Sequence, residues 1–229
     1  MRVEARYGRT NMQQTAGLRW WHRIIGRDDK FYVLLEEGAQ EVKTSVNLLS
    51  AYLEARSKGL PTPPEADFTE SRRRQKQIRT ETVAELNKSL VPPFDRQDIQ
   101  ALAYALYRVP KAIERLVERI SIYPGRIPYA GFTRQAEYLT IAADGLVTMV
   151  HLLCSGADIE KVGVANARLQ AAEGEADKMM LQLLQELYAG PFEAKEVVIV
   201  NKLYEMMERA VDRCRNVGNL VVQITLKQT

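Results

Sequence analysis

The chain has few of the residues that support covalent chemistry or soft-metal binding. Its 229 residues include two cysteines, Cys154 and Cys214, and two histidines, His22 and His151. The cysteines lie far apart and form no CxxC pair, which argues against a disulfide framework or a thiolate zinc site and fits a reducing cytoplasm. No HExxH or ExxH element is present to supply an imidazole ligand to a helical metal site.

Long apolar runs and cofactor fingerprints are also missing. No apolar run reaches the roughly 18 residues needed to span a bilayer, and the N-terminus lacks the apolar core of a signal peptide. We find no glycine-rich phosphate loop, nucleophile–base pair or dinucleotide fingerprint. The net charge of +3 is too small to indicate nucleic-acid binding by itself. We therefore expect a cytoplasmic location and no nucleic-acid partner.

Helical periodicity dominates the chain, and no credible strand alternation interrupts it. The pattern predicts six helices: about 31–59, 66–90, 95–120, 133–154, 158–189, and a last one around the heptad from Val200 to Ile224. Asp95 is placed to cap the third helix, and Gly190-Pro191 reads as a C-cap glycine followed by a helix breaker. The fold class is therefore all-α.

The six helices fall into two similar halves. A shift of 101 residues superposes Phe31 on Phe132 and Val46 on Val147, and it brings three helices into register without a gap. We interpret residues 1–30 as an N-terminal tail with a short lead-in helix. Residues 31–122 and 132–226 then form two tandem three-helix bundles, separated by the break "YPGRIPYAG".

Two pairs of carboxylates stand out on the last two helices. Glu173 and Asp177 lie four residues apart in "EGEAD", and Glu208 and Asp212 repeat that spacing in "ERAVD". At about 100° per residue, both pairs fall on the same-hand edge of an apolar stripe. Glu173 and Glu208 are also equally far from the Gly190-Pro191 turn, about 26 Å at 1.5 Å per residue. The four carboxylates should therefore cluster where antiparallel helices meet.

Such a cluster requires neutralisation, because two carboxylates about 5 Å apart repel by roughly 3 kcal/mol at an effective dielectric near 20. Protons, a cationic side chain or a metal ion would each offset the repulsion, and oxygen-rich sites between helices suit hard or borderline metals. The alternative is an ordinary solvated surface pair, in which Arg215 simply neutralises Asp212.

At this level of detail the sequence resembles a known family. "SLVPPFDRQDI", the elements "EGEAD" and "ERAVD", and the ending "LYEMMERAVDRCRNVGNLVVQITLK" resemble the PhoU-like Pit accessory proteins over residues 18 to 227. The resemblance implies a PhoU-like six-helix repeat whose acidic motifs hold metal clusters. It also implies a non-catalytic regulator that associates with a Pit-type inorganic phosphate transporter.

The first half departs from the family's acidic pattern. In the register of 101 residues, Arg72 and Lys76 stand opposite Glu173 and Asp177, while Tyr107 and Lys111 stand opposite Glu208 and Asp212. We therefore expect no metal in the N-terminal half. Instead, Arg72, Lys76 and Lys111 should converge and bind an anion such as phosphate or an acidic side chain of a partner.

The metal prediction is thus confined to the C-terminal half. The expected ligands are Glu173, Asp177, Glu208 and Asp212, and the sequence does not distinguish iron, zinc, manganese and magnesium. Arg215, which stands where the family usually has an acid, weakens this site.

Two other functions stay open at this stage, a carboxylate-bridged metalloenzyme of the helical-bundle type and a metal-free helical scaffold. We expect a homo-oligomer, and peripheral association with a membrane is compatible with the sequence.

Overall fold

The computed structural model describes residues 29–156 and 158–228, which fold into helices joined by short turns. The helices are α2 (Asp29–Lys58), α3 (Glu65–Lys88), α4 (Arg96–Ser121), α5 (Tyr129–Cys154), α6 (Ile159–Ala189) and α7 (Ala194–Leu226). Within these ranges there is no strand. The predicted all-α class is confirmed, whereas the tail and lead-in helix expected over residues 1–30 lie almost entirely outside the described residues.

The helix ends follow from local capping chemistry. The Asp95 carboxylate accepts a hydrogen bond of 2.8 Å from the Gln97 amide and so caps α4, as predicted. The Asp158 carboxylate caps α6 in the same way through the Lys161 amide, at 3.0 Å. Gly190 ends α6 with φ −80° and ψ 168°. It is therefore extended, and the left-handed C-cap conformation that commonly favours glycine at this point is absent from that turn.

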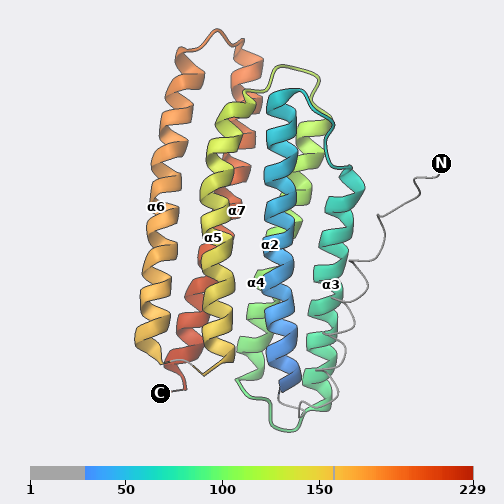
Figure 1. Cartoon of the computed structure of the whole chain (residues 1–229), viewed down its shortest axis with the longest axis vertical. Helices are drawn as coiled ribbons and strands as arrows, with labels where there is room; N and C mark the ends of the chain where they lie inside the picture. The colour runs from blue at the N-terminus through green and yellow to red at the C-terminus, as the bar shows by residue number, and fades with distance from the viewer. Residues whose placement is uncertain (1–28, 157, 229) are drawn as a thin grey trace, which may run out of the picture.

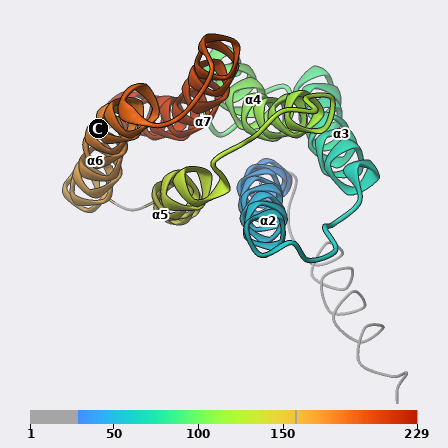
Figure 2. The same ribbon diagram turned by 90° about the horizontal axis from the view of Figure 1, so that it is seen from above.

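The helices form two bundles that pack side by side. Helices α2, α3 and α4 contact one another, as do α5, α6 and α7, and the two groups meet through α2–α5 and α4–α7. Figure 2 shows α2 and α5 next to each other, below an arc made by α3, α4, α7 and α6. The six-helix arrangement of two tandem three-helix bundles is as predicted.

The two contacts between the bundles are antiparallel. Along α2–α5, Glu36 pairs with His151 and Lys43 with Asp144, both at 2.8 Å, so that the start of one helix lies beside the end of the other (Figure 1). The 101-residue register itself stays a prediction. In that register Lys43 and Asp144 are equivalent positions, and they face each other across the contact.

A single hydrophobic core runs through both bundles. All six helices contribute buried apolar side chains to it. The heptad of α7 is entirely buried, as its spacing predicts: Val200, Leu203, Met207, Ala210, Cys214, Val217, Val221 and Ile224. The apolar stripe predicted for α6, through Leu169, Ala176, Met180 and Leu187, is also buried. Charged residues beside these stripes must therefore lie at the seams between helices.

Among the described helices, α5 alone is long and apolar enough to cross a membrane. Polar residues interrupt its sequence, so it contains no uninterrupted apolar run of that length. In this structure it packs against α2, α6 and α7. Its buried face includes Phe132, Leu139 and Leu146. A core helix of a bundle passes the same test of hydropathy, so the finding is weak evidence for a membrane span.

Two helical glycines give opposite predictions for the same substitution. A Cβ added at Gly218 of α7 would lie 2.6 Å from Leu169 Cδ2 and 3.0 Å from Met149 Sδ, whereas nothing lies within 4 Å of one added at Gly163 of α6. We expect Gly218→Ala to destabilise the protein by about 1–3 kcal/mol through overpacking. Gly163→Ala should stabilise it by about 0.5–1 kcal/mol through helix propensity.

Chemical denaturation of the two variants and the wild type measures both effects. Equal effects of the same sign at the two positions would contradict the close approach of α7 to α5 and α6.

Candidate functional site

The four predicted carboxylates meet on the α6–α7 contact, together with Arg215. We call this group, Glu173, Asp177, Glu208, Asp212 and Arg215, the C-terminal seam. The Arg215 guanidinium donates a hydrogen bond to Glu173, and its Nη2 atom lies 3.6 Å from Asp212 Oδ1. The Glu173 side chain is only 14% exposed, whereas that of Arg215 is 35% exposed, so the pair is shielded from solvent mainly at its carboxylate.

The carboxylates of the C-terminal seam repel one another. Burial raises the pKa of Glu173 above its ordinary value, and Asp177 and Asp212 raise it further against the opposing effect of Arg215. The pKa of Glu208 is also raised, first by burial and then by Asp177, Asp212 and Glu205. The antiparallel geometry therefore brings the four predicted carboxylates within electrostatic range of one another.

Arg215 neutralises two of the predicted metal ligands, Glu173 and Asp212. Across the described part of the chain, no three His, Cys, Asp or Glu side chains are arranged to hold a metal ion. Oxygen donors of the right type are present, but Glu173 and Asp212 already have a cationic partner. The metal site stays a prediction, and metal would have to displace the guanidinium to form it.

The matching position in the first bundle contains an ion pair of its own. Arg72 Nε on α3 lies 2.5 Å from Glu114 Oε2 on α4, and the Glu114 side chain is 10% exposed. The hydrogen bond to Glu114 raises the pKa of Arg72, opposed by burial. Lys111 lies over the Tyr107 ring, 5.5 Å from its centroid, and Lys76 is exposed on α3. We call Arg72, Lys76, Tyr107, Lys111 and Glu114 the N-terminal seam.

This arrangement bears on the predicted anion site. The structure places Arg72 and Lys111 at the α3–α4 contact, but Glu114 neutralises Arg72 directly. Fewer uncompensated cations are available to an anion than the sequence suggested. Anion binding by Arg72, Lys76 and Lys111 stays a prediction, and the N-terminal seam has no donor set for a cation.

The two seams contain the same ion pair with the charges exchanged. In the predicted register, Arg72 corresponds to Glu173 and Glu114 to Arg215, because each pair of positions is separated by 101 residues. In the first bundle the arginine comes from the middle helix, whereas in the second it comes from the last. Sequence reasoning missed Glu114 and assigned Arg215 to Asp212 alone. Comparing position 114 with position 215 would have revealed the exchange.

Comparisons with known proteins agree with this fold. No model of a known protein family matches the chain. A protein of Rhizobium meliloti (strain 1021) named "Putative pit accessory protein" is 23% identical over 90% of this chain and 97% of its own length. The UPF0111 protein YkaA of Bacillus subtilis (strain 168) is 23% identical over 63% of this chain and 70% of its own length.

Two solved structures from Shewanella oneidensis MR-1 resemble most of this chain. One, a "putative PhoU-like phosphate regulatory protein", superposes with a TM-score of 0.68 and 16% identity, over 87% of this chain and all of its own. The other, a PhoU-like protein, superposes with a TM-score of 0.67 and 18% identity, over 86% and 96%. The predicted resemblance to PhoU-like Pit accessory proteins and the PhoU-like fold are thereby confirmed.

The raised pKa of Glu208 gives a test of how the C-terminal seam is neutralised. A folded-state pKa above the unfolded value means that the folded protein holds the proton more tightly. The Glu208 carboxyl therefore lowers stability as pH rises between the two values. Glu208→Gln should raise the Tm at pH 7, and the difference should vanish below about pH 4. Relief of about 0.5 kcal/mol corresponds to about 1–2 °C in a chain of this size.

The matched control is Glu81→Gln, which removes an exposed carboxylate of α3 and should leave the Tm unchanged. Melting curves are recorded with a chelator across the pH range. A Glu208→Gln protein that melts below the wild type at pH 7 under these conditions would show that the Glu208 charge is favourable in the fold.

Proposed function

We propose that this protein is a cytoplasmic, non-catalytic regulator of inorganic phosphate transport that associates with a Pit-type transporter. One observation carries the proposal: the relative named as a pit accessory protein aligns over 90% of this chain and 97% of its own length. A similarity that spans both chains extends to the whole architecture and not merely to a shared helix pair. The PhoU-like superpositions support the same fold.

The structure supports a binding role through its charged helix surfaces. The seams set ionised side chains at contacts between helices, where a change in charge alters helix packing. A metalloenzyme of the bundle type would need carboxylates open to metal and substrate, whereas Arg215 is paired with Glu173 and Asp212. These pairs favour a protein that acts by association.

Deleting the gene should change phosphate uptake or phosphate-responsive expression in the host, and an affinity-tagged copy should co-purify with a Pit-type transporter from detergent-solubilised membranes. The wild-type gene should restore uptake when supplied in trans. Unchanged uptake, together with no transporter in the purified material, would contradict the proposed function.

Metal binding is a separate part of the proposal and is confined to the C-terminal seam. We propose that Arg215 and a divalent or trivalent cation compete for Glu173, Asp177, Glu208 and Asp212. A cation gains those ligands only when the guanidinium leaves, so removing Arg215 should favour the metal-bound state. The Arg215→Met variant keeps an unbranched, flexible side chain, although a shorter one, and removes the guanidinium and its charge.

Without metal, Arg215→Met should lose about 2 kcal/mol, between the values typical of exposed and buried ion pairs. Added Mn²⁺ or Zn²⁺ should then raise its Tm more than that of the wild type, because binding to the folded state stabilises it. Adding Asp212→Asn should abolish this gain, whereas adding Lys76→Met should not.

Elemental analysis and melting curves with each ion measure these effects. If neither the wild type nor Arg215→Met contains metal, and no ion moves either Tm, the acids form a charged seam without metal.

A further inference from the structure

A second charged region lies on the opposite edge of α7, where that helix packs against α4. A groove of about 850 Å³ runs between the two helices. Arg115 and Arg119 of α4 and Lys202 and Arg209 of α7 line it. We call it the basic groove. None of the predicted site residues belongs to it.

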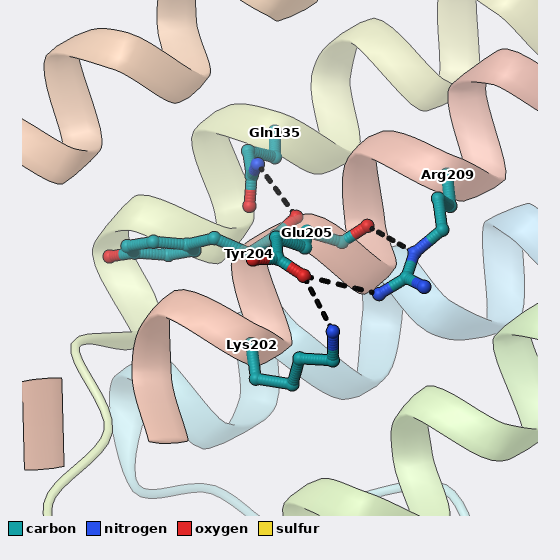
Figure 3. Close-up of polar contacts among 5 residues, drawn as sticks. All are labelled: Gln135, Lys202, Tyr204, Glu205 and Arg209. Atoms are coloured by element: carbon teal, nitrogen blue, oxygen red, sulfur yellow. Dashed lines mark hydrogen bonds and ion pairs between the residues drawn. The ribbon is translucent and has the colours of Figure 1, made fainter. Parts of the chain in front are cut away.

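The cations of the basic groove are only partly compensated. Figure 3 shows the Glu205 carboxylate between Lys202 and Arg209; its Oε2 atom lies 2.8 Å from the lysine and 3.4 Å from the arginine. Arg115 and Arg119 have no ion pair with any carboxylate of the described chain. Glu118 is the one acid lining the groove itself.

Two further arginines extend this positive region along the same contact. Arg213 Nη1 donates a hydrogen bond of 3.1 Å to the Arg108 backbone oxygen. Burial lowers the pKa of Arg213, and the neighbouring Arg108, Arg115 and Arg209 lower it further. Neighbouring like charges repel one another. An anionic occupant would relieve that repulsion.

The interior of the groove is apolar. Ile199, Leu203 and Met206 lie within it, and Ile122 and Val198 are exposed at 73% and 69%. Exposed aliphatic side chains inside a concave, positively charged surface suit an occupant that combines apolar and acidic groups. Inorganic phosphate would leave these apolar side chains uncovered.

The dimensions suit a short helix. The part of α7 that lines the groove, from Val198 to Arg209, extends about 17 Å at 1.5 Å per residue, which is roughly three helical turns. Amphipathic helices bind such grooves with their apolar face inward and their charged residues toward the rim. Residues 1–28 of this chain carry six arginines and two acids, so their charge has the same sign as the groove.

We propose that the basic groove between α4 and α7 binds an acidic amphipathic helix of a partner protein. The proposal goes beyond the regulatory function, because it assigns a surface and the chemistry of its occupant whatever the identity of the partner. A flat anionic membrane or free phosphate would share the charge of this occupant but would not fill the apolar interior of the groove.

A labelled model peptide tests the proposal with purified protein. The probe is an amphipathic peptide of about 18 residues with leucine on one face and glutamate on the other, long enough to cover the groove. Its control carries lysine in place of every glutamate. Fluorescence anisotropy should show binding of the acidic peptide only, and the affinity should fall steeply as salt is added.

Matched variants locate the binding surface. Arg115→Glu/Arg119→Glu should weaken binding at least about tenfold. Arg73→Glu/Arg168→Glu, which makes the same charge change at exposed positions of α3 and α6, should not. Ile122→Gln/Val198→Gln keeps the charge and should also weaken binding, because it removes apolar contacts. Circular dichroism melting verifies that each variant folds.

Three results would overturn the proposal. The acidic peptide would bind no better than the lysine control, or Arg115→Glu/Arg119→Glu would leave its affinity unchanged. Alternatively, the arginines would be needed for binding to phosphatidylglycerol vesicles or for stabilisation by inorganic phosphate, while the acidic peptide showed no binding. None of these measurements involves transport. A negative result would therefore contradict the proposed groove without contradicting the proposed regulatory function.

Discussion

The burial of one apolar stripe on each of six long helices is the constraint on which the rest of this structure depends. The stripes join in a single core that crosses both bundles. Residues beside a stripe are carried to the contacts between helices, where they are partly removed from water and meet the residues beside the neighbouring stripe. A charge in such a place requires a partner, because desolvation makes an uncompensated charge costly. The ion pairs Arg72–Glu114 and Glu173–Arg215 follow from this requirement.

The two bundles each place one arginine–glutamate ion pair at a helix contact, with the charges exchanged between the two helices. In each seam a guanidinium from one helix neutralises a carboxylate from the neighbouring helix, but the guanidinium comes from α3 in the first bundle and from α7 in the second. The C-terminal seam also holds Asp177, Glu208 and Asp212, and its acids outnumber its cation. Burial raises the pKa values of Glu173 and Glu208, and the neighbouring carboxylates of that excess raise them further. A cation binding there would relieve repulsion, whereas one binding at the N-terminal seam would meet Arg72 and Lys111.

Most of the fold could be predicted from the sequence, because helix periodicity and capping are local properties. Asp95 caps α4 as expected, and the heptad through Met207 and Cys214 is buried. The gathering of Glu173 with Asp212 was also predictable, since Gly190-Pro191 fixes which helices are antiparallel neighbours. The pairing of Glu114 with Arg72 was open to prediction from the 101-residue register, in which Arg72 matches Glu173 and Glu114 matches Arg215. The α4–α7 contact, by contrast, joins segments about 100 residues apart with no turn to set their register. The basic groove could not be predicted for that reason: Arg115 and Arg209 become neighbours only when the two bundles pack together.

Helix α7 brings these charged regions together, and its two edges have opposite character. At about 100° per residue, Glu208, Asp212 and Arg215 lie on one side of the buried stripe, toward α6, while Lys202, Arg209 and Arg213 lie on the other, toward α4. The chain's net charge of +3 averages over these regions and conceals both of them. A weakly charged protein can therefore present an acidic seam and a basic groove on one helix. Because α7 contacts α4, α5 and α6, a change in charge at either edge acts on the helix that also holds the two bundles together.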